Sequence, residues 1–100
     1  MDKDNYFSEL EQRLLLLIEI CKMDVKDEQL KLINEKLHNK EYAIALQGIC
    51  SYYIKNKTML SINASEIVYE LINKMEMNDI DDDDYWFWQS IESLLTRSRE

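Results

Sequence analysis

The chain has no proline and only one glycine, Gly48, among its 100 residues. These two residue types end most strands and make most tight hairpin turns, so a sheet of short strands would have few places to reverse direction. The sequence therefore predicts an all-α fold, a compact bundle of about five short antiparallel helices. Its length fits one domain, and we expect residues 1–100 to form a single helical domain.

Helix boundaries are predicted from capping residues that flank segments with apolar spacings of three and four. The expected helices are a first with a capping box of Ser8 and Glu11 that ends near Lys22, a second capped by Asp24 or Asp27 that ends at 38–40, a third over 41–56, a fourth with a capping box of Asn63 and Glu66, and a fifth that begins at Asp84.

Each expected helix has an apolar stripe that we predict to be buried. Gly48, in the third helix, would allow a neighbour to approach closely. Arg97 and Arg99 would complement the dipole at the end of the fifth helix. The stripes are Leu10, Leu14, Leu17, Ile18 and Cys21; Leu30, Ile33 and Leu37; Tyr42, Ala45, Leu46, Ile49, Cys50 and Tyr53; Ile67, Val68, Leu71, Ile72 and Met75; and Phe87, Trp88, Ile91, Leu94 and Leu95.

Charge and hydropathy argue against several classes of binding partner and several cellular locations. The formal net charge of −8 disfavours nucleic acid and anionic membrane surfaces, which bind through Lys and Arg. The longest apolar run, 14–18, is too short for a membrane span or a secretion signal, so we expect a cytoplasmic protein. Cys21 and Cys50 fall inside apolar helical patterns, which favours buried reduced thiols over a disulfide or a zinc set.

The residues also lack the marks of an enzyme. His38, the only histidine, lies at an expected helix end without a serine or cysteine motif beside it, and is better read as exposed or capping. One glycine cannot make a phosphate-binding loop, and the many carboxylates do not single out an acid–base pair. We expect no catalysis and no cofactor.

The segment "NDIDDDDYWFWQS", residues 78–90, is the most unusual in the chain. Asp79, Asp81 and Asp83 match positions 1, 3 and 5 of a calcium loop, but Asp84 replaces the required glycine and Ser90 the bidentate glutamate, so an EF-hand is disfavoured and only weak divalent binding remains open. The aspartates could instead solvate a loop and complement a helix N-terminus. One or two would suffice for that, which leaves a surplus suited to a partner-binding surface.

Acidity is concentrated in the last third of the chain. Residues 1–65 hold ten acids and nine bases, whereas residues 66–100 hold ten acids and three bases, and 75–96 has no Lys or Arg. This segment should project a negative field towards a basic protein. The predicted partner-binding residues are Glu76, Asp79, Asp81, Asp82, Asp83, Asp84, Tyr85 and Trp86.

Two arrangements of Trp86 remain open. If Trp88, Ile91 and Leu95 face inward, Trp86 lies about 200° round the helix from Trp88 and is exposed beside the aspartates. Alternatively, Trp86 folds back over the helix start and packs under the loop.

Three segments resemble the MafI family of bacterial immunity proteins, which are small all-helical partners of secreted polymorphic toxins. The segments are "HNKEYAIALQGICSYYIKN" at 38–56, "SINASEIVYELINKMEMND" at 61–79 and "YWFWQSIESLL" at 85–95. A longer aspartate run before Tyr85 and the lack of a proline near 57–62 depart from the family pattern. The matching positions are Asn39, Glu41, Tyr42, Ala45, Leu46, Ile49, Cys50, Tyr85 and Trp86.

The resemblance implies an antitoxin-like protein that binds one cognate toxin domain, often a nuclease, and blocks its basic active site or substrate groove. Such a protein would be a monomer or small oligomer when free and would need no cofactor. The rival interpretation is an acidic helical adaptor, or a nucleic-acid mimic that regulates another basic protein. A toxin gene immediately upstream would favour immunity over that rival.

Overall fold

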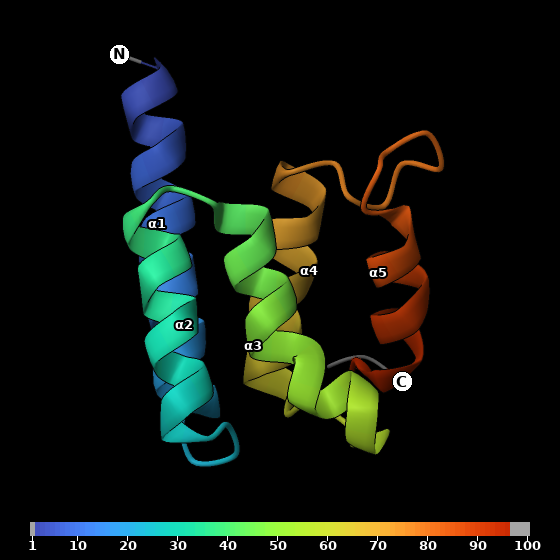
Figure 1. Cartoon of the computed structure of the whole chain (residues 1–100). Coiled ribbons are helices and arrows are strands. Elements are labelled where there is room, and N and C mark those ends of the chain that lie inside the picture. The colour runs from blue at the N-terminus through green and yellow to red at the C-terminus, as the bar shows by residue number, and fades with distance from the viewer. Residues whose placement is uncertain (1, 97–100) are drawn as a thin grey trace. The chain divides into compact units, whose positions relative to one another are not determined.

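The computed structural model describes residues 2–96, with side chains from residue 5 onward, and this part of the chain is all-α without a strand (Figure 1). The sequence-based expectation of about five short helices is confirmed. The elements are α1 (Asp2–Cys21), α2 (Asp27–His38), α3 (Tyr42–Asn56), α4 (Ile62–Lys74), α5 (Tyr85–Ile91) and a short 3-10 helix, η1 (Glu92–Leu94).

The chain divides into two compact units, Met1–Ile49 and Cys50–Glu100, with the boundary inside α3. The first unit holds α1, α2 and the start of α3, and the second holds the rest of α3 with α4, α5 and η1. The single domain expected from the sequence stays a prediction.

In the first unit, α1 and α2 run antiparallel and are joined by a short turn (Figure 1). The predicted stripe of α1 is buried at Leu10, Leu14, Leu17 and Cys21, and full burial of one leucine contributes about 1.5 to 3 kcal/mol. The predicted start at Ser8 is wrong, because α1 already begins at Asp2. A tertiary contact supports these early turns: the ring of Phe7 stacks on that of Tyr42 with centroids 5.9 Å apart.

Gly48 gives α3 a close contact with α2, as its position in the sequence predicted. A Cβ on Gly48 would lie 3.0 Å from Cγ1 of Ile33, which is itself buried. On the same side of α2, the Gln29 side chain donates a hydrogen bond to the Gly48 carbonyl oxygen at 2.9 Å. The missing side chain therefore lets the two backbones approach, and this offsets the lower helix propensity of glycine, about 1 kcal/mol.

Tyr42 makes the first unit sensitive to alkaline pH. Burial, with a smaller contribution from the charge of Glu11, raises the pKa of the Tyr42 phenol above its ordinary value of 10.0. Below pH 10 this group is neutral in both the folded and the unfolded chain. As the pH rises from 10 to the raised pKa, the unfolded chain ionises first, so the free energy of unfolding should fall. Denaturation curves between pH 8 and 11 should show this loss reduced in Tyr42→Phe, which keeps the ring; an identical loss in both proteins would contradict the assignment.

The N-terminal caps of α2 and α4 differ from those expected. Lys26 occupies the cap position of α2 without a side-chain hydrogen bond, and Asp27 lies inside the first turn, where its charge suits the helix dipole. Ser61 caps α4 by accepting a hydrogen bond from the Ala64 amide at 3.2 Å, so the expected cap at Asn63 is two positions too late. The capping signals expected for both helices are local in the sequence. For α4, a competing serine, Ser61, lies within one turn of Asn63.

The second unit packs α4 against α5, which run antiparallel in Figure 1. The α4 stripe is buried as predicted except for the half-buried Met75, which follows the helix. In α5 the fully buried residues are Phe87 and Ile91, whereas Trp88, expected to lead the stripe, is half-buried with its ring edge against Tyr69, 5.9 Å between centroids. The smaller ring of Phe87 fills the interior position.

The fifth helix is shorter than its apolar spacing predicted. After η1, Leu95 is extended, with φ −88° and ψ 131°. The Leu60 amide donates to the Leu94 carbonyl oxygen at 2.9 Å, and the Thr96 amide donates to Oγ of Ser65 at 2.7 Å. These hydrogen bonds to distant residues occupy backbone groups that a continuing helix would use. The predicted role of Arg97 and Arg99 falls outside the described residues.

Candidate functional site

The predicted binding residues lie in and beside the connection from α4 to α5. We call residues 78–84 the acidic loop; it is drawn in orange at the end of α4 in Figure 1. It has no regular secondary structure. After a hydrogen bond from Asp79 N to Glu76 O at 3.3 Å, three further backbone hydrogen bonds shape it into successive turns. They run from Asp82 N to Asp79 O at 2.9 Å, from Tyr85 N to Asp82 O at 3.1 Å, and from Phe87 N to Asp84 O at 2.9 Å.

Two aspartates hold the loop through their own side chains. Oδ1 of Asp79 accepts from the Asp81 amide at 2.9 Å, and Oδ1 of Asp82 accepts from the Asp84 amide at 2.8 Å. Each is a turn in which the side chain bonds the backbone two residues on. The side chains of Asp81 and Asp83 are exposed and make neither of these contacts. The loop therefore combines a structural carboxylate with an outward one in each of two successive turns.

Trp86 is exposed at the start of α5. Its exposed fraction is 54%, and its ring meets the buried ring of Phe87 edge-on at 6.1 Å between centroids. Of the two arrangements left open by the sequence, the structure therefore has the exposed one. The reason is local geometry: Phe87 takes the interior position, and its two neighbours project to either side of it.

Ile80 is a binding candidate that the sequence reasoning missed. It is 75% exposed, in the middle of the aspartate run. The signal was present, because an isoleucine between acidic residues and outside any helical spacing has no predicted core to enter. Together with Trp86 it gives the acidic loop two exposed apolar side chains. These residues and their neighbours form what we call the acidic–aromatic surface. Its members are Asp79, Ile80, Asp81, Asp82, Asp83, Asp84, Tyr85 and Trp86.

Within this surface the predicted residues differ in exposure. Asp82, Asp84 and Tyr85 are half-buried, and the others are exposed. Asp84 precedes α5 at the cap position, but its side chain makes no capping hydrogen bond to the helix.

Glu76 lies outside this surface, at the end of α4. It has a positive φ of 56°, its amide donates to the Asn73 carbonyl oxygen at 3.2 Å, and the Met77 amide donates to that of Ile72 at 3.0 Å. This is the Schellman motif, whose left-handed position glycine normally occupies. The side chain of Met77, 1% exposed, anchors the turn in the interior.

Replacing Glu76 by glycine should stabilise the protein. The left-handed conformation costs a residue with a Cβ about 1 to 2 kcal/mol, so Glu76→Gly should raise the free energy of unfolding by about 1 kcal/mol. Glu76→Ala is the matched control, since it removes the same charge but keeps the Cβ, and it should give no such gain. Urea denaturation of the three proteins measures the difference; equal stability of the glycine and alanine variants would show that charge, not backbone strain, sets the cost.

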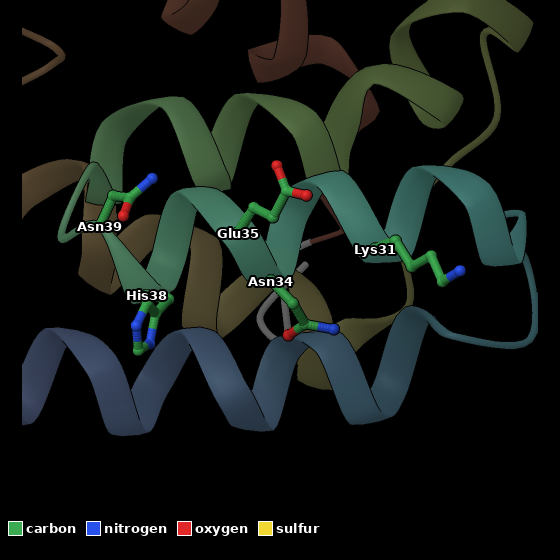
Figure 2. Close-up of a pocket in the computed structure, with 5 residues that line it drawn as sticks. All are labelled: Lys31, Asn34, Glu35, His38 and Asn39. Atoms are coloured by element: carbon green, nitrogen blue, oxygen red, sulfur yellow. The ribbon is translucent and has the colours of Figure 1, made fainter.

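A different hollow lies on α2 in the first unit. It has a volume of about 550 Å³ and is lined by four exposed residues of α2, Lys31, Asn34, Glu35 and His38, and by the exposed C-cap residue Asn39 (Figure 2). His38 is exposed, as expected, and no serine, threonine or cysteine is among these five residues. Among the described residues, the lining therefore comes from α2 and its C-cap.

Nowhere in 2–96 do three or more His, Cys, Asp or Glu side chains gather in a way that could hold a metal ion. None of the helices in this range combines the length and apolar character needed to cross a bilayer. Cys21 and Cys50 are both buried thiols, as predicted.

Comparison of the chain with known protein families, with curated proteins and with solved structures finds no match.

Proposed function

We propose that this chain is an immunity protein without catalytic activity, which binds a cognate toxin domain of the nuclease class and covers its basic active site or substrate groove. The observation that carries the proposal is the acidic–aromatic surface. It combines an exposed tryptophan and an exposed isoleucine with a run of aspartates on one connection. The resemblance to the MafI family in the sequence points to the same activity.

The charge of the surface suits a nuclease as partner. A nuclease attracts phosphate and therefore has a basic groove, and a negative surface accelerates association with such a groove. No Lys or Arg lies between residues 75 and 96, so local cations do not neutralise this stretch. The aspartates would steer the encounter and determine which partners are accepted.

The apolar side chains suit the persistence of the complex. Tryptophan is enriched among the residues that dominate binding energy, and such residues act when a partner pocket removes them from water. Trp86 presents about half of its surface before binding, and Ile80 presents more. A groove with an apolar depression rimmed by Lys and Arg would complement both features.

Co-expression tests the proposal directly. The toxin gene adjacent to the gene for this chain is expressed with and without it, and the purified proteins are mixed at defined ratios. We expect growth to be rescued, a stable complex in size-exclusion chromatography with light scattering, and nuclease activity that falls linearly to zero at a fixed stoichiometric ratio. The chain alone should not cleave nucleic acid or esters.

Three outcomes would contradict the proposal. Multiple-turnover cleavage by the chain itself, lost on changing one side chain, would make it an enzyme. Failure to bind the adjacent toxin, with binding to a basic protein of another kind, would favour the adaptor or nucleic-acid-mimic interpretation. A complex that leaves nuclease activity intact would show binding without immunity.

A further inference from the structure

We propose that Ser65 and Thr96 act as positioning residues, forming a clamp that holds α5, and with it the acidic–aromatic surface, in the shape that a partner binds. This inference rests on the proposed function only for the last step, the effect on the partner. The clamp itself is a property of the second unit. We call Leu60, Ser65, Leu94 and Thr96 the C-terminal clamp.

The clamp is a closed set of hydrogen bonds between residues far apart in the sequence. Thr96 contributes both its amide, which donates to Oγ of Ser65 at 2.7 Å, and its hydroxyl, which donates to the Leu60 carbonyl oxygen at 2.6 Å. The Ser65 hydroxyl in turn donates to the same carbonyl oxygen at 3.4 Å, and the Leu60 amide donates to that of Leu94 at 2.9 Å. Leu94 and Thr96, which follow α5, are thereby tied to the start of α4 and to the loop before it.

Ser65 is the centre of this set. Its exposed fraction is 0%, and it is the one polar residue among the buried residues of the described chain. A hydroxyl that is both acceptor and donor there replaces water for two backbone groups at once. Its removal would leave the Thr96 amide without that acceptor in a place that water reaches poorly.

Helix α5 depends on such an attachment because it is short. It has seven residues, about two turns, and isolated helices of that length are not stable in water. The preceding acidic loop supplies only short-range turns, and Asp84 makes no capping hydrogen bond. The described attachments of α5 to the rest of the unit are the burial of Phe87 and Ile91, the edge-on contact of Trp88 with Tyr69, and the clamp at the end of the helix.

Loss of the clamp should therefore open α5 locally without unfolding the unit. The opening would include residues 79–96, since the acidic loop has no long-range backbone hydrogen bond of its own among those described. A partner that binds only the closed form sees its apparent affinity reduced by the closed fraction. Residues remote from the surface would in this way control its binding.

Hydrogen exchange of the free protein tests the clamp without any partner. Thr96→Val keeps the amide and the side-chain size but removes the hydroxyl, and Ser65→Ala removes the centre of the set. We expect amide protection in 85–94 to fall about tenfold in either variant, with protection in α4 and in the first unit unchanged. Thr96→Ser should restore protection, and Ser93→Ala, which changes an exposed serine of η1, is the matched control.

Fluorescence gives a second readout in case Ser65→Ala folds poorly. In a Trp86→Phe background, Trp88 is the only tryptophan left of two, and it packs edge-on against Tyr69 of α4. Opening of α5 should expose it, so Thr96→Val should shift its emission to the red and increase quenching by acrylamide. An unchanged emission and unchanged exchange in α5 would overturn the clamp, as would an equal loss of protection in α4, because that reports global destabilisation.

Association of the cognate toxin with Thr96→Val should weaken in proportion to the open fraction measured by exchange, and Thr96→Ser should recover it. An open α5 with unchanged toxin affinity would overturn the coupling while leaving the clamp. If the unaltered protein binds no toxin, the proposed function fails, and hydrogen exchange still decides the clamp.

Discussion

Trp86→Ala should accelerate dissociation of the toxin by about 30-fold or more. Truncation of a tryptophan at the centre of an interface typically costs 2 kcal/mol or more, and a factor of ten corresponds to about 1.4 kcal/mol. Because its ring is 54% exposed in the free protein, its loss should leave the fold nearly as stable as before. Surface plasmon resonance gives the dissociation rate, and a denaturation curve gives the stability.

Phe87→Ala is the control that separates contact from folding. The ring of Phe87, next to Trp86 in the sequence, is fully buried, and truncation of a core phenylalanine costs about 3 to 5 kcal/mol of stability. The two aromatic variants should therefore show opposite patterns. If Trp86→Ala destabilises the free protein as strongly as Phe87→Ala does, the exposed arrangement of Trp86 is wrong; if it changes neither rate nor stability, Trp86 is not an anchor.

Replacing Asp81, Asp82, Asp83 and Asp84 together by asparagine should slow toxin association by about tenfold or more at low salt and flatten its dependence on ionic strength. Asparagine keeps a side-chain oxygen, so the bond from the Asp84 amide to position 82 can persist and the loop should retain its shape. The dissociation rate should change less. Stopped-flow kinetics at several salt concentrations measures both effects.

The control for charge neutralises four exposed acids of the first unit, Glu9, Glu11, Glu28 and Glu35, as glutamine. Both variants change the formal net charge of −8 by the same amount. Equal slowing in the two would show that overall charge, not the acidic loop, steers association. Unchanged association in the asparagine variant would remove the acidic loop from the recognition surface.

Helix number and buried faces could be predicted from the sequence because they follow from spacing along one segment. The stripe of α1 at Leu10, Leu14 and Leu17 is an example, and so is the close contact at Gly48. Helix starts were predicted less well. Ser8 and Asn63 carry capping signals that are valid locally, but α1 gains an aromatic contact before the first, and Ser61 precedes the second.

The end of α5 could not be predicted from local pattern at all. Leu94 and Leu95 continue the helical spacing, yet the backbone turns away there: the Leu94 carbonyl oxygen accepts from the Leu60 amide, and the next amide, that of Thr96, donates to Ser65. The order of the aromatic residues poses the same difficulty. Spacing alone does not decide whether Phe87 or Trp88 occupies the interior position, because both lie next to the apolar stripe.

The structure of the candidate site could be predicted from the sequence only in part, and its role in binding stays a prediction. A surplus of aspartates marked 79–84, and the turns show which of them are occupied by the backbone. Exposure of Trp86 depended on which neighbour entered the interior, and the contribution of Ile80 depended on the loop leaving it outside. Both are consequences of packing between residues, which the spacing along a single sequence does not determine.

The alternation of aspartates in the loop bears on how such a protein can diverge. Asp79 and Asp82 hold the turns with their side chains, whereas Asp81 and Asp83 point outward and leave the loop geometry to their neighbours. Substitutions at the two outward positions would alter the charge pattern offered to a partner while the backbone keeps its course. Specificity could therefore drift between related partners in single steps, each tolerated by the fold, with the inherited scaffold unchanged.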